Sequence, residues 1–301
     1  MAATYTKLDG PDDGGNMEHS WQGSYLQAHL LSDVGKKRNF NEDRCVVSAP
    51  EHPDLARERG VLFAVADGMG GVSGGGFASR LALDALVDEY FTGDSPSICR
   101  RLRQSIEVAN RRIFEEAFSQ PQYAGMGTTV SAMLVHGDNA YVAQVGDSRV
   151  YLFRGNNSIW QITDDHSLVA EQVRNGFLSE QEARTHSLKN LITRAVGTRE
   201  IVNVDLFSVR IKRGDTMLIC SDGLSNLVED RHLVEAMSMP SLQAAARTLV
   251  GRALDAGGSD NITVVLIRVN HAPPKTRLEE GAIKVSLTTS GFLTKLRRFM
   301  S

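Results

Sequence analysis

Three apolar runs in this sequence lead into an aspartate, and this pattern limits what the chain can fold into. The runs and the acids that follow them are 61–66 with Asp67, 141–145 with Asp147, and 216–220 with Asp222. A fourth acid, Asp260, stands just before the apolar run 262–267. Runs of about four to eight apolar and β-branched residues bounded by glycine are typical of buried strands. The acids are therefore predicted at the points where buried strands leave a core.

Acids gathered at strand ends predict a metal site. Carboxylates held together repel one another and resist desolvation, at roughly several kcal/mol for each unpaired ion. Hard cations remove that cost, because Mg²⁺, Mn²⁺ and Ca²⁺ prefer oxygen ligands. A single Asp-Gly pair is usually a turn, but here two such pairs, at Asp67 and Asp222, both end apolar runs. We interpret them, together with Asp147 and Asp260, as ligands of one metal cluster.

The composition is that of a globular protein without a basic face. With 301 residues, 42% hydrophobic and 23% charged, the chain can form one large domain or two ordinary ones. A net charge of −3 gives no support for nucleic-acid binding, which needs a basic surface. The three cysteines form no Cys-x-x-Cys pair, as expected of small buried side chains in a reducing compartment. No stretch approaches the roughly 20 apolar residues that span a bilayer, so we predict a cytoplasmic protein.

Apolar patterns along the chain predict an α+β sandwich. The predicted strands are 26–32, 44–49, 61–66, 128–136, 140–145, 149–154, 203–210, 216–220 and 262–269, and the predicted helices are 77–91, 97–118, 229–238 and 241–255. Connections as short as 137–139 and 146–149 require antiparallel pairing. Because helices come in pairs between groups of strands, we expect antiparallel sheets covered by helices. The polar segment 164–200 is predicted to be a flap over the site, and residues 1–22 a disordered leader.

Two other interpretations of the acidic motifs are weaker. The segment 67–73 lacks the Gly-x-Gly-x-x-Gly spacing of a dinucleotide-binding turn, because Ser73 occupies the last position. Residues 146–148 read Gly-Asp-Ser, which could mark a serine-hydrolase nucleophile, but that chemistry needs a histidine base. The late histidines, His232 and His271, have no aspartate three residues before them.

His166 follows two aspartates and could be a metal ligand or an acid catalyst. Such a run is more often the start of a helix, with Asp or Ser as the capping residue. We therefore interpret residues 164–167 as a helix cap that leads into Leu168.

The polar segment 32–43 places Arg38 four and five residues before two acids, Glu42 and Asp43. A charged surface loop is the simpler interpretation. The functional one is a phosphate-binding arginine beside carboxylates that hold cations, since a guanidinium forks onto phosphate oxygens.

With these motifs in order, the sequence resembles the metal-dependent Ser/Thr protein phosphatases of the type 2C group, in the form common in bacteria. The resemblance runs from about residue 26 to residue 269. It rests on eight blocks that occur in the family's order: Ser32-Asp33-x-Gly35 with Arg38 and Asn41-Glu42-Asp43; Asp67-Gly68-Met69-Gly70-Gly71; Gly127-Thr128-Thr129; Gly146-Asp147-Ser148-Arg149; Thr163-x-Asp165-His166-Ser167; Ile192-Thr193-Arg194-Ala195-Val196-Gly197; Ser221-Asp222-Gly223; and Asp260-Asn261.

The resemblance implies a four-layer α-β-β-α sandwich over residues 23–270, in which two antiparallel sheets are flanked by helices and metals lie at one edge. Asp67 would bridge two divalent cations, Mn²⁺ or Mg²⁺. Asp222 and Asp260 would complete the protein ligands of one cation, while Glu42 and the Gly68 carbonyl would serve the other.

The resemblance also implies the roles of neighbouring residues. Arg38 would bind the substrate phosphate, and Asp43 would act from behind the ligands by orienting metal-bound waters, with Asn261 also behind them. Asp147 would join Asp222 at a third, weaker cation site. Asn226 lies near that site, at a position where relatives commonly have aspartate.

The implied activity is hydrolysis of phosphoserine and phosphothreonine on proteins by a hydroxide that bridges the two metals, in opposition to a Ser/Thr kinase. Met69 stands where many eukaryotic relatives have a histidine, and methionine cannot donate a proton to the leaving group. Two alternatives stay open: a weakly active pseudophosphatase that serves as a phosphoprotein-binding module, and another metal-dependent hydrolase such as a nuclease.

The tail 271–301 is basic, with six Lys or Arg against two Glu. The apolar residues of 291–300 recur at helical spacing. They predict either a helix docked on its own domain or a basic amphipathic helix that contacts a partner protein or an anionic membrane.

Overall fold

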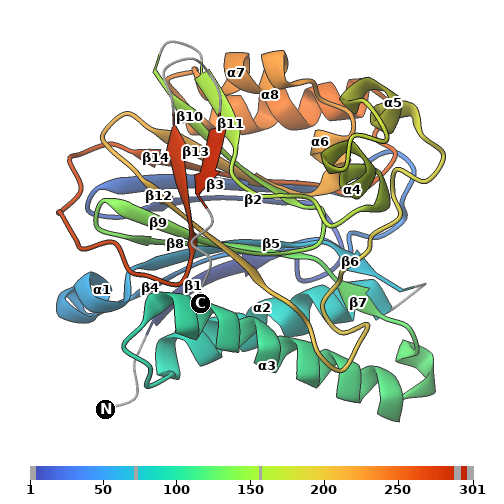
Figure 1. The fold of residues 1–301 in the computed structure, drawn as a ribbon, viewed down its shortest axis with the longest axis horizontal. Helices are drawn as coiled ribbons and strands as arrows, with labels where there is room; N and C mark the ends of the chain where they lie inside the picture. The colour runs from blue at the N-terminus through green and yellow to red at the C-terminus, as the bar shows by residue number, and fades with distance from the viewer. Residues whose placement is uncertain (1–4, 71–73, 156–157, 288–292, 297–301) are drawn as a thin grey trace.

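Two sheets form the centre of the fold, packed face to face and covered on their outer sides by helices (Figure 1). This computed structural model describes residues 5–70, 74–155, 158–287 and 293–296. The four-layer α+β sandwich expected from the sequence is confirmed. Its layers explain why the strand runs are apolar throughout, because strands covered on both faces have no solvent side.

The larger sheet is built mainly from antiparallel neighbours. In sheet order its strands are β1 (Tyr5–Gly10), β4 (Arg44–Pro50), β5 (Val61–Ala66), β8 (Val130–His136), β9 (Asn139–Val145), β12 (Asp205–Arg210), β15 (Ile283–Leu287) and β16 (Leu293–Leu296). The pair β12–β15 is parallel and has two residue pairs in register, whereas β9 and β12 have six.

The second sheet is antiparallel throughout. Its strands in order are β11 (Ser158–Gln161), β10 (Arg149–Arg154), β13 (Thr216–Cys220), β14 (Ile262–Val269), β3 (Leu26–Asp33) and β2 (Met17–Gln22). A short third ladder joins β6 (Gly68–Met69) to β7 (Gly127–Thr128). The strands predicted from the sequence all occur, with ends shifted by at most two residues except where the predicted run 128–136 divides into β7 and β8.

Helices cover the outer faces of both sheets. The helices of the described residues are α1 (Pro53–Arg59), α2 (Gly74–Thr92), α3 (Ile98–Ser119), the 3₁₀ turn η1 (Pro121–Tyr123), α4 (Leu168–Arg174), α5 (Glu180–Thr185), α6 (Asp222–Ser225), α7 (Asp230–Met237) and α8 (Leu242–Asp255). The helices α2 and α3 lie on the larger sheet, and α7 and α8 on the other (Figure 1). Side chains of Ser97 and Ser241 accept bonds from the first turns of α3 and α8, so local capping sets where these helices begin.

The strand β5 shows how the layers are held together. Leu62 and Ala64 pack towards α2 and α3, whereas Phe63 and Val65 pack between the two sheets. All four are fully buried, and each large apolar side chain contributes roughly 1.5–3 kcal/mol by leaving water. The core therefore fixes the register of β5 and with it the position of the residue that follows, Asp67.

Strand direction brings the four acids to one end of the sandwich. The ends of β5 and β13 carry Asp67 and Asp222, one from each sheet. Because β14 runs antiparallel to β13, the start of β14, which follows Asp260, lies beside the end of β13. The turn from β9 to β10 crosses between the sheets and carries Asp147.

The N-terminal segment differs from its prediction. Residues 5–22 are not a disordered leader, because β1 pairs with β4 over six residues and β2 pairs with β3 over six. The ring of Tyr5 stacks on Phe91 with 5.3 Å between centroids, and Met17 is buried in the layer between the sheets. The polar composition of the segment concealed these contacts, since each strand buries only part of its side chains against a distant partner.

The C-terminal segment is also not the predicted helix where the structure describes it. Leu293–Leu296 form β16, paired with β15, and residues 291–292 and 297–300 of the predicted helix lie outside the described residues. The edge of β12 offers backbone groups that β15 bonds, and β15 offers its own edge to β16, which favours a strand over a helix at Leu293–Leu296. Ahead of β15, the Glu279 carboxylate accepts bonds from Ser97 Oγ (3.0 Å) and Ile98 N (2.7 Å) at the start of α3.

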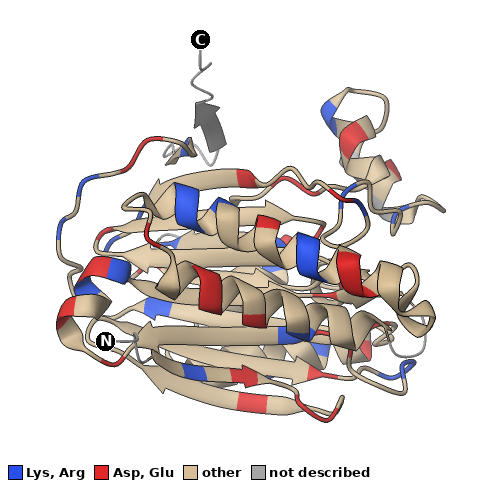
Figure 2. Cartoon of the chain, turned by 90° about the horizontal axis from the view of Figure 1, so that it is seen from below, with Lys and Arg blue, Asp and Glu red and all other residues tan. Residues whose placement is uncertain are grey.

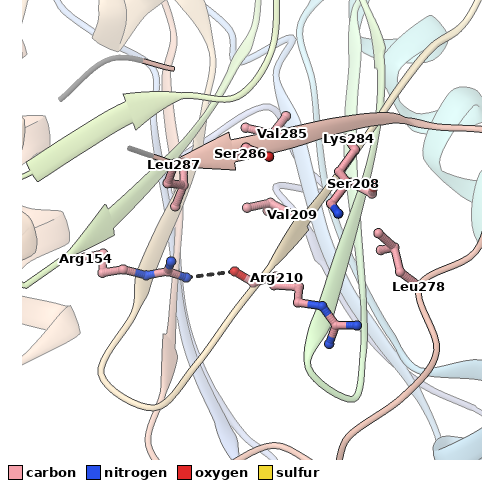
Figure 3. A pocket seen from close by; sticks show the side chains of 9 residues that line it. All are labelled: Arg154, Ser208, Val209, Arg210, Leu278, Lys284, Val285, Ser286 and Leu287. Atoms are coloured by element: carbon pink, nitrogen blue, oxygen red, sulfur yellow. Dashed lines mark hydrogen bonds between the residues drawn. The ribbon is translucent and has the colours of Figure 1, made fainter. Parts of the chain in front are cut away.

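A pocket of about 240 Å³ is lined by residues of both β12 and β15 (Figure 3). Two of its cationic side chains are already paired, Arg154 with Asp215 at 2.6 Å and Arg210 with Asp138 at 2.5 Å. Figure 3 also shows the bond from Arg154 to the Arg210 carbonyl, at 2.7 Å. The pocket therefore offers no uncompensated guanidinium to a ligand.

Basic and acidic residues are interspersed on the helices that face the viewer in Figure 2, so this side of the molecule has no face of a single sign. Among the described residues, no helix is long and apolar enough to cross a bilayer. The cytoplasmic location and the absence of nucleic-acid binding stay predictions.

Candidate metal centre

Asp67 and Asp222 approach each other at one end of the sandwich, one from each sheet. The Asp222 carboxyl lies within hydrogen-bonding reach of Asp67, which two carboxylates tolerate only when they share a proton or a cation. Burial, followed by the charge of Asp260, raises the pKa of Asp222 to about 6. Burial also raises the pKa of Asp67 well above its usual value, and the charges of Asp43, Asp222 and Asp147 add to this effect. The predicted acids are thus close enough to influence one another's charge.

Asp147 gives the clearest indication of a cation site. Its side chain is 7% exposed, and its buried Oδ1 has no hydrogen-bond partner among the described residues. Burial raises its pKa well above the usual value, and the neighbouring charges of Asp222 and Asp165 raise it further. A buried carboxylate oxygen without a partner is costly, and a cation would relieve that cost.

Asp260 is held by the predicted phosphate-binding residue. Arg38 Nε lies 2.9 Å from Asp260 Oδ1, and Nη2 donates to Oδ2 at 2.9 Å. The Arg38 side chain is 49% exposed. The structure therefore places this guanidinium at the mouth of the site, with two of its nitrogens directed at a candidate ligand.

Glu42 and Gly68 converge at the first turn of α2. Burial raises the pKa of Glu42, while bonds from the Gly76 and Gly75 backbone oppose that shift. An atom added at Gly75 Cα would lie 2.7 Å from Glu42 Oε1 and 2.8 Å from the Gly68 carbonyl oxygen, so both oxygens border the same point. A side chain at Gly68 itself would come within 2.2 Å of the Gly75 carbonyl oxygen, so only glycine allows this approach.

The acids approach one another without closing into a finished ligand set. Among the described residues, no three Asp, Glu, His or Cys side chains stand close enough together to form a ready metal-binding group. Glu42 is engaged by amides and Asp260 by Arg38, as described above. The donors are nevertheless all oxygen, and with the unpaired Asp147 Oδ1 and the Asp67–Asp222 contact they fit a hard divalent cation.

Asp43 lies behind these acids and is 1% exposed. Its Oδ2 accepts hydrogen bonds from Ser221 Oγ and Thr263 Oγ1, each at 2.7 Å. Burial raises the pKa of Asp43 to about 7, although these two hydroxyls lower it. Neither hydroxyl residue was predicted to hold Asp43. The signal for Thr263 was its hydroxyl inside an otherwise apolar strand, and for Ser221 its place directly before Asp222.

Asn261 holds the loop that carries Arg38. Its Nδ2 donates to the carbonyls of Val34 (2.8 Å) and Phe40 (3.0 Å), and its Oδ1 accepts from Glu42 N at 2.8 Å. One amide therefore fixes both ends of the segment between two candidate site residues.

Asn226 contacts the site through Asp222. Its Nδ2 donates to Asp222 Oδ2 at 2.9 Å, and the residue is exposed. Asn226 therefore touches one acid of the Asp147–Asp222 pair, and its place near a cation site stays a prediction.

The segment around His166 begins a helix, as predicted. Ser167 accepts a bond from Ala170 N and caps α4. His166 itself is 3% exposed and its ring lies between Gly146 and Asp205. Its burial against the turn before Asp147 was not predicted.

The flap borders a cleft beside the acids. This cleft has a volume of about 410 Å³, and its lining includes Asp147 and Asp222 on one side and Val169, Val173 and Arg174 of α4 on the other. The helices α4 and α5 of the segment 164–200 stand at the same end of the sandwich as α6 and β6 (Figure 1). A substrate that reaches the acids can therefore contact the flap as well.

Comparison with known proteins shows which family this chain resembles. The family described as "Protein phosphatase 2C" matches residues 37–256. The serine/threonine phosphatase stp of Listeria welshimeri is 37% identical over 250 residues, which cover 81% of this chain and 96% of the relative.

Solved structures agree with the sequence match. The crystal structure of the serine/threonine phosphatase PstP/Ppp of Mycobacterium tuberculosis shares 35% identity and a TM-score of 0.72, and the match covers 82% of this chain and all of that one. The catalytic domain of PstP in complex with two manganese ions shares 34% identity and a TM-score of 0.71, over 82% of this chain and 99% of that one.

Proposed function

This chain belongs to the protein phosphatase 2C family, and from that premise we propose that it removes phosphate from phosphoserine and phosphothreonine on proteins. The chain is a protein serine/threonine phosphatase, and its family is metal-dependent. The observation that carries the proposal is the family match over residues 37–256, because that range includes the strand ends on which Asp67, Asp147 and Asp222 stand. Similarity to proteins named as phosphatases favours catalysis over a pseudophosphatase role.

The core cations are assigned to oxygens from both sheets. Asp67 is proposed to serve two cations, with Asp222 and Asp260 on one side and Glu42 and the Gly68 carbonyl on the other. Bound cations supply charge that lowers the pKa of water towards neutrality and offsets the charge of the phosphoryl oxygens. The solved PstP structure holds manganese, and we propose Mn²⁺ or Mg²⁺ for this chain.

The residues around the acids are proposed to bind the substrate phosphate and to orient water. Arg38 is proposed to direct its guanidinium to the substrate phosphate from the mouth of the site, where it is half exposed. Asp43 is proposed to hold its position through Ser221 and Thr263, and from there to orient water bound beside Asp67. Asn261 keeps the Arg38 loop against Asp260.

A third, weaker cation is proposed at Asp147 and Asp222. The unpaired Asp147 Oδ1 supports this site. Asn226 brings no negative charge to it, and cation affinity falls as anionic ligands are lost. Met69 has no proton to donate, so we assign it no role as an acid.

We propose phosphorylated proteins as substrates and a Ser/Thr kinase as the opposing enzyme. Contact of the C-terminal tail with a partner protein or a membrane stays a prediction. The 2C domain, expected from the sequence at residues 23–270, is proposed to include β1 and β2 as well, because they pair with β4 and β3. Its flap is proposed at 164–200.

Metal-dependent hydrolysis is the first expected result. The purified chain should hydrolyse p-nitrophenyl phosphate and a phosphothreonine peptide with Mn²⁺ and lose that activity in excess EDTA, because the carboxylates need cations to activate water. Single- and double-stranded DNA serve as the control substrates and should stay intact. Full activity in excess chelator, or cleavage of DNA in preference to the phosphopeptide, would contradict the proposal.

Arg38→Ala should weaken phosphate binding more than it slows turnover. We expect KM for p-nitrophenyl phosphate to rise by about tenfold, as for loss of a charge-assisted hydrogen bond, while kcat falls less. The physical reason is that a guanidinium on the ground-state phosphate contributes mostly uniform binding. Arg38→Lys is the control, since it keeps the charge without the planar fork. Its KM should lie between those of the wild type and Arg38→Ala. A large loss of kcat at unchanged KM would show that this role is wrong.

A further inference from the structure

The buried residue His166 has no part in the function proposed above, yet both its backbone and its ring hold the turn that precedes Asp147. His166 N donates to the Gly146 carbonyl at 2.9 Å, and Gly146 N donates to His166 Nδ1 at 3.0 Å. The Gly146 carbonyl also accepts a bond from Gln144 Nε2 at 3.0 Å. The carbonyl and the N–H of Gly146 are therefore both hydrogen-bonded, and the N–H donates to the imidazole.

The other side of the imidazole is held by a strand of the larger sheet. Nδ1 accepts the bond from Gly146 N, and Nε2 lies 3.1 Å from Asp205 Oδ2 and 3.1 Å from Arg194 Nη1. Asp205 belongs to β12, and its Oδ1 accepts from Arg194 Nη1 at 2.8 Å. The ring is thus fixed between the larger sheet and the Gly146 turn.

His166 also lies where the flap joins the domain. Its carbonyl accepts a bond from Thr193 N at 2.8 Å, and Leu168 N donates to the Leu191 carbonyl at 2.9 Å. The two ends of the flap therefore run side by side at His166. A change in the position of this residue would act on the flap and on the Gly146 turn together.

The Gly146 turn has little freedom to adjust by other means. Gly146 has φ +107°, and an added Cβ would lie 2.5 Å from Thr129 Cγ2. The next residue, Asp147, is the buried acid whose Oδ1 has no hydrogen-bond partner among the described residues. No direct bond to a donor orients that oxygen, so its direction depends on the backbone of the turn.

We propose that His166 is a positioning residue: its Nδ1 fixes the Gly146 turn, aims the Asp147 carboxylate, and thereby sets the affinity of the Asp147–Asp222 site for a divalent cation. The inference rests on the proposed function, in which these two acids hold the third cation. It adds that the base of the flap and this cation site share one side chain. Partners behind metal ligands commonly change metal affinity by about 10- to 100-fold when they are removed.

Three variants separate the two sides of the imidazole. His166→Asn keeps an acceptor at the Nδ1 position for Gly146 N and loses the contact with Asp205. His166→Gln reaches towards Asp205 but lacks an acceptor at the Nδ1 position, and His166→Ala has neither. If Nδ1 carries the effect, His166→Asn should behave like the wild type, whereas His166→Gln and His166→Ala should both lose cation affinity.

The measurement is Mn²⁺ bound per chain at a series of free Mn²⁺ concentrations, read from the electron paramagnetic resonance signal of the free ion. For the weakest ion, half-saturation should rise by about tenfold or more in His166→Gln and His166→Ala, and stay within about twofold of the wild type in His166→Asn. Steady-state kinetics on the same samples should show kcat at subsaturating Mn²⁺ falling in parallel, with KM for p-nitrophenyl phosphate little changed.

A second buried histidine provides the matched control. His29 is 2% exposed, and its two ring nitrogens contact Ser20 Oγ at 2.8 Å and Glu18 Oε1 at 3.0 Å. His29→Ala removes a buried, doubly bonded imidazole from β3 without touching the Gly146 turn. It should lower the melting temperature in EDTA while leaving the Mn²⁺ titration unchanged.

Each outcome decides the question. A wild-type Mn²⁺ titration in His166→Ala, or a shift in His166→Asn as large as in His166→Ala, would overturn the role of Nδ1 while leaving the phosphatase function intact. A wild-type chain that neither binds Mn²⁺ nor hydrolyses phosphate esters would overturn the proposed function, and this inference with it. If His166→Ala fails to fold, the comparison of His166→Asn with His166→Gln decides.

Discussion

Asp67→Asn should abolish phosphatase activity and at the same time make the metal-free protein more stable. The amide is nearly the same size as the carboxylate and can keep a hydrogen bond to Asp222, so the fold should be preserved. Activity should fall by about a thousandfold or more, since the residue proposed to serve both core cations loses its charge. The metal-free protein should gain stability because burial, together with the charges of Asp43, Asp222 and Asp147, makes ionised Asp67 costly.

Two measurements on the same samples test this expectation. Hydrolysis of a phosphothreonine peptide in Mn²⁺ gives the loss of activity. Melting temperatures in EDTA and in Mn²⁺ give the gain in metal-free stability and the expected loss of stabilisation by metal. Asp94→Asn, at an exposed acid away from the strand ends, is the control and should change neither. Wild-type activity, or a lower melting temperature in EDTA, would refute the assignment of Asp67.

The metal-free protein should become less stable as the pH rises from about 4 to about 8. Burial holds the pKa of Asp222 at about 6 and that of Asp43 at about 7, above the value of roughly 3.9 for an unfolded aspartate. In this range the folded state binds protons that the unfolded state has released. Their contribution to stability is therefore complete below about pH 4 and is lost as the pH passes through 6 and 7. Each pH unit that separates a folded pKa from its unfolded value corresponds to about 1.4 kcal/mol, so the loss is on the order of a few kcal/mol.

Divalent cations should reverse this trend. Carboxylates must lose their protons to bind a cation, so the stabilisation by Mn²⁺ should grow as the pH rises over the same range. Calorimetric melting temperatures at intervals from pH 5 to pH 8, in EDTA and in Mn²⁺, give both curves.

Asp205 affects stability at lower pH. Although burial raises its pKa, bonds from His166 and Arg194 lower that pKa to about 2. The contribution of Asp205 to stability is therefore lost only as the pH falls below about 4.

Asp222→Asn is the control for the pH effect and should flatten the decline in EDTA. Metal-free melting temperatures that rise steadily from pH 5 to pH 8 would contradict the account. They would mean that the acids at the strand ends do not control stability in this range.

Local patterns were sufficient for most of the fold. The runs at β5 and β13 are apolar throughout because both faces of these strands are buried, and such runs can be recognised in the sequence. The starts of α3 and α8 follow serine caps, which act over three residues. The N-terminal and C-terminal strands were missed because each is stabilised by pairing with an edge far away in the chain: β1 with β4, and β15 with β12.

In the candidate site, too, some residues follow from local patterns and others depend on distant parts of the chain. Asp67, Asp147, Asp222 and Asp260 could be predicted, since a carboxylate directly beside an apolar run is unusual enough to need a charge partner. Their surroundings could not. The hydroxyls on Asp43 come from Ser221 and Thr263, which are 178 and 220 residues distant in the chain. No local rule pairs groups at such separations.

The sequence by itself determined the apolar strands of the core, roughly where each one ends, and which acids stand at those ends, because burial and capping act on neighbouring residues. Only the tertiary structure decided how these ends meet. The packing of two sheets brought Asp67 and Asp222 into contact, paired Arg38 with Asp260, and placed His166 against Gly146. Those contacts depend on strand order and sheet packing, which are set by the core as a whole rather than by any one segment.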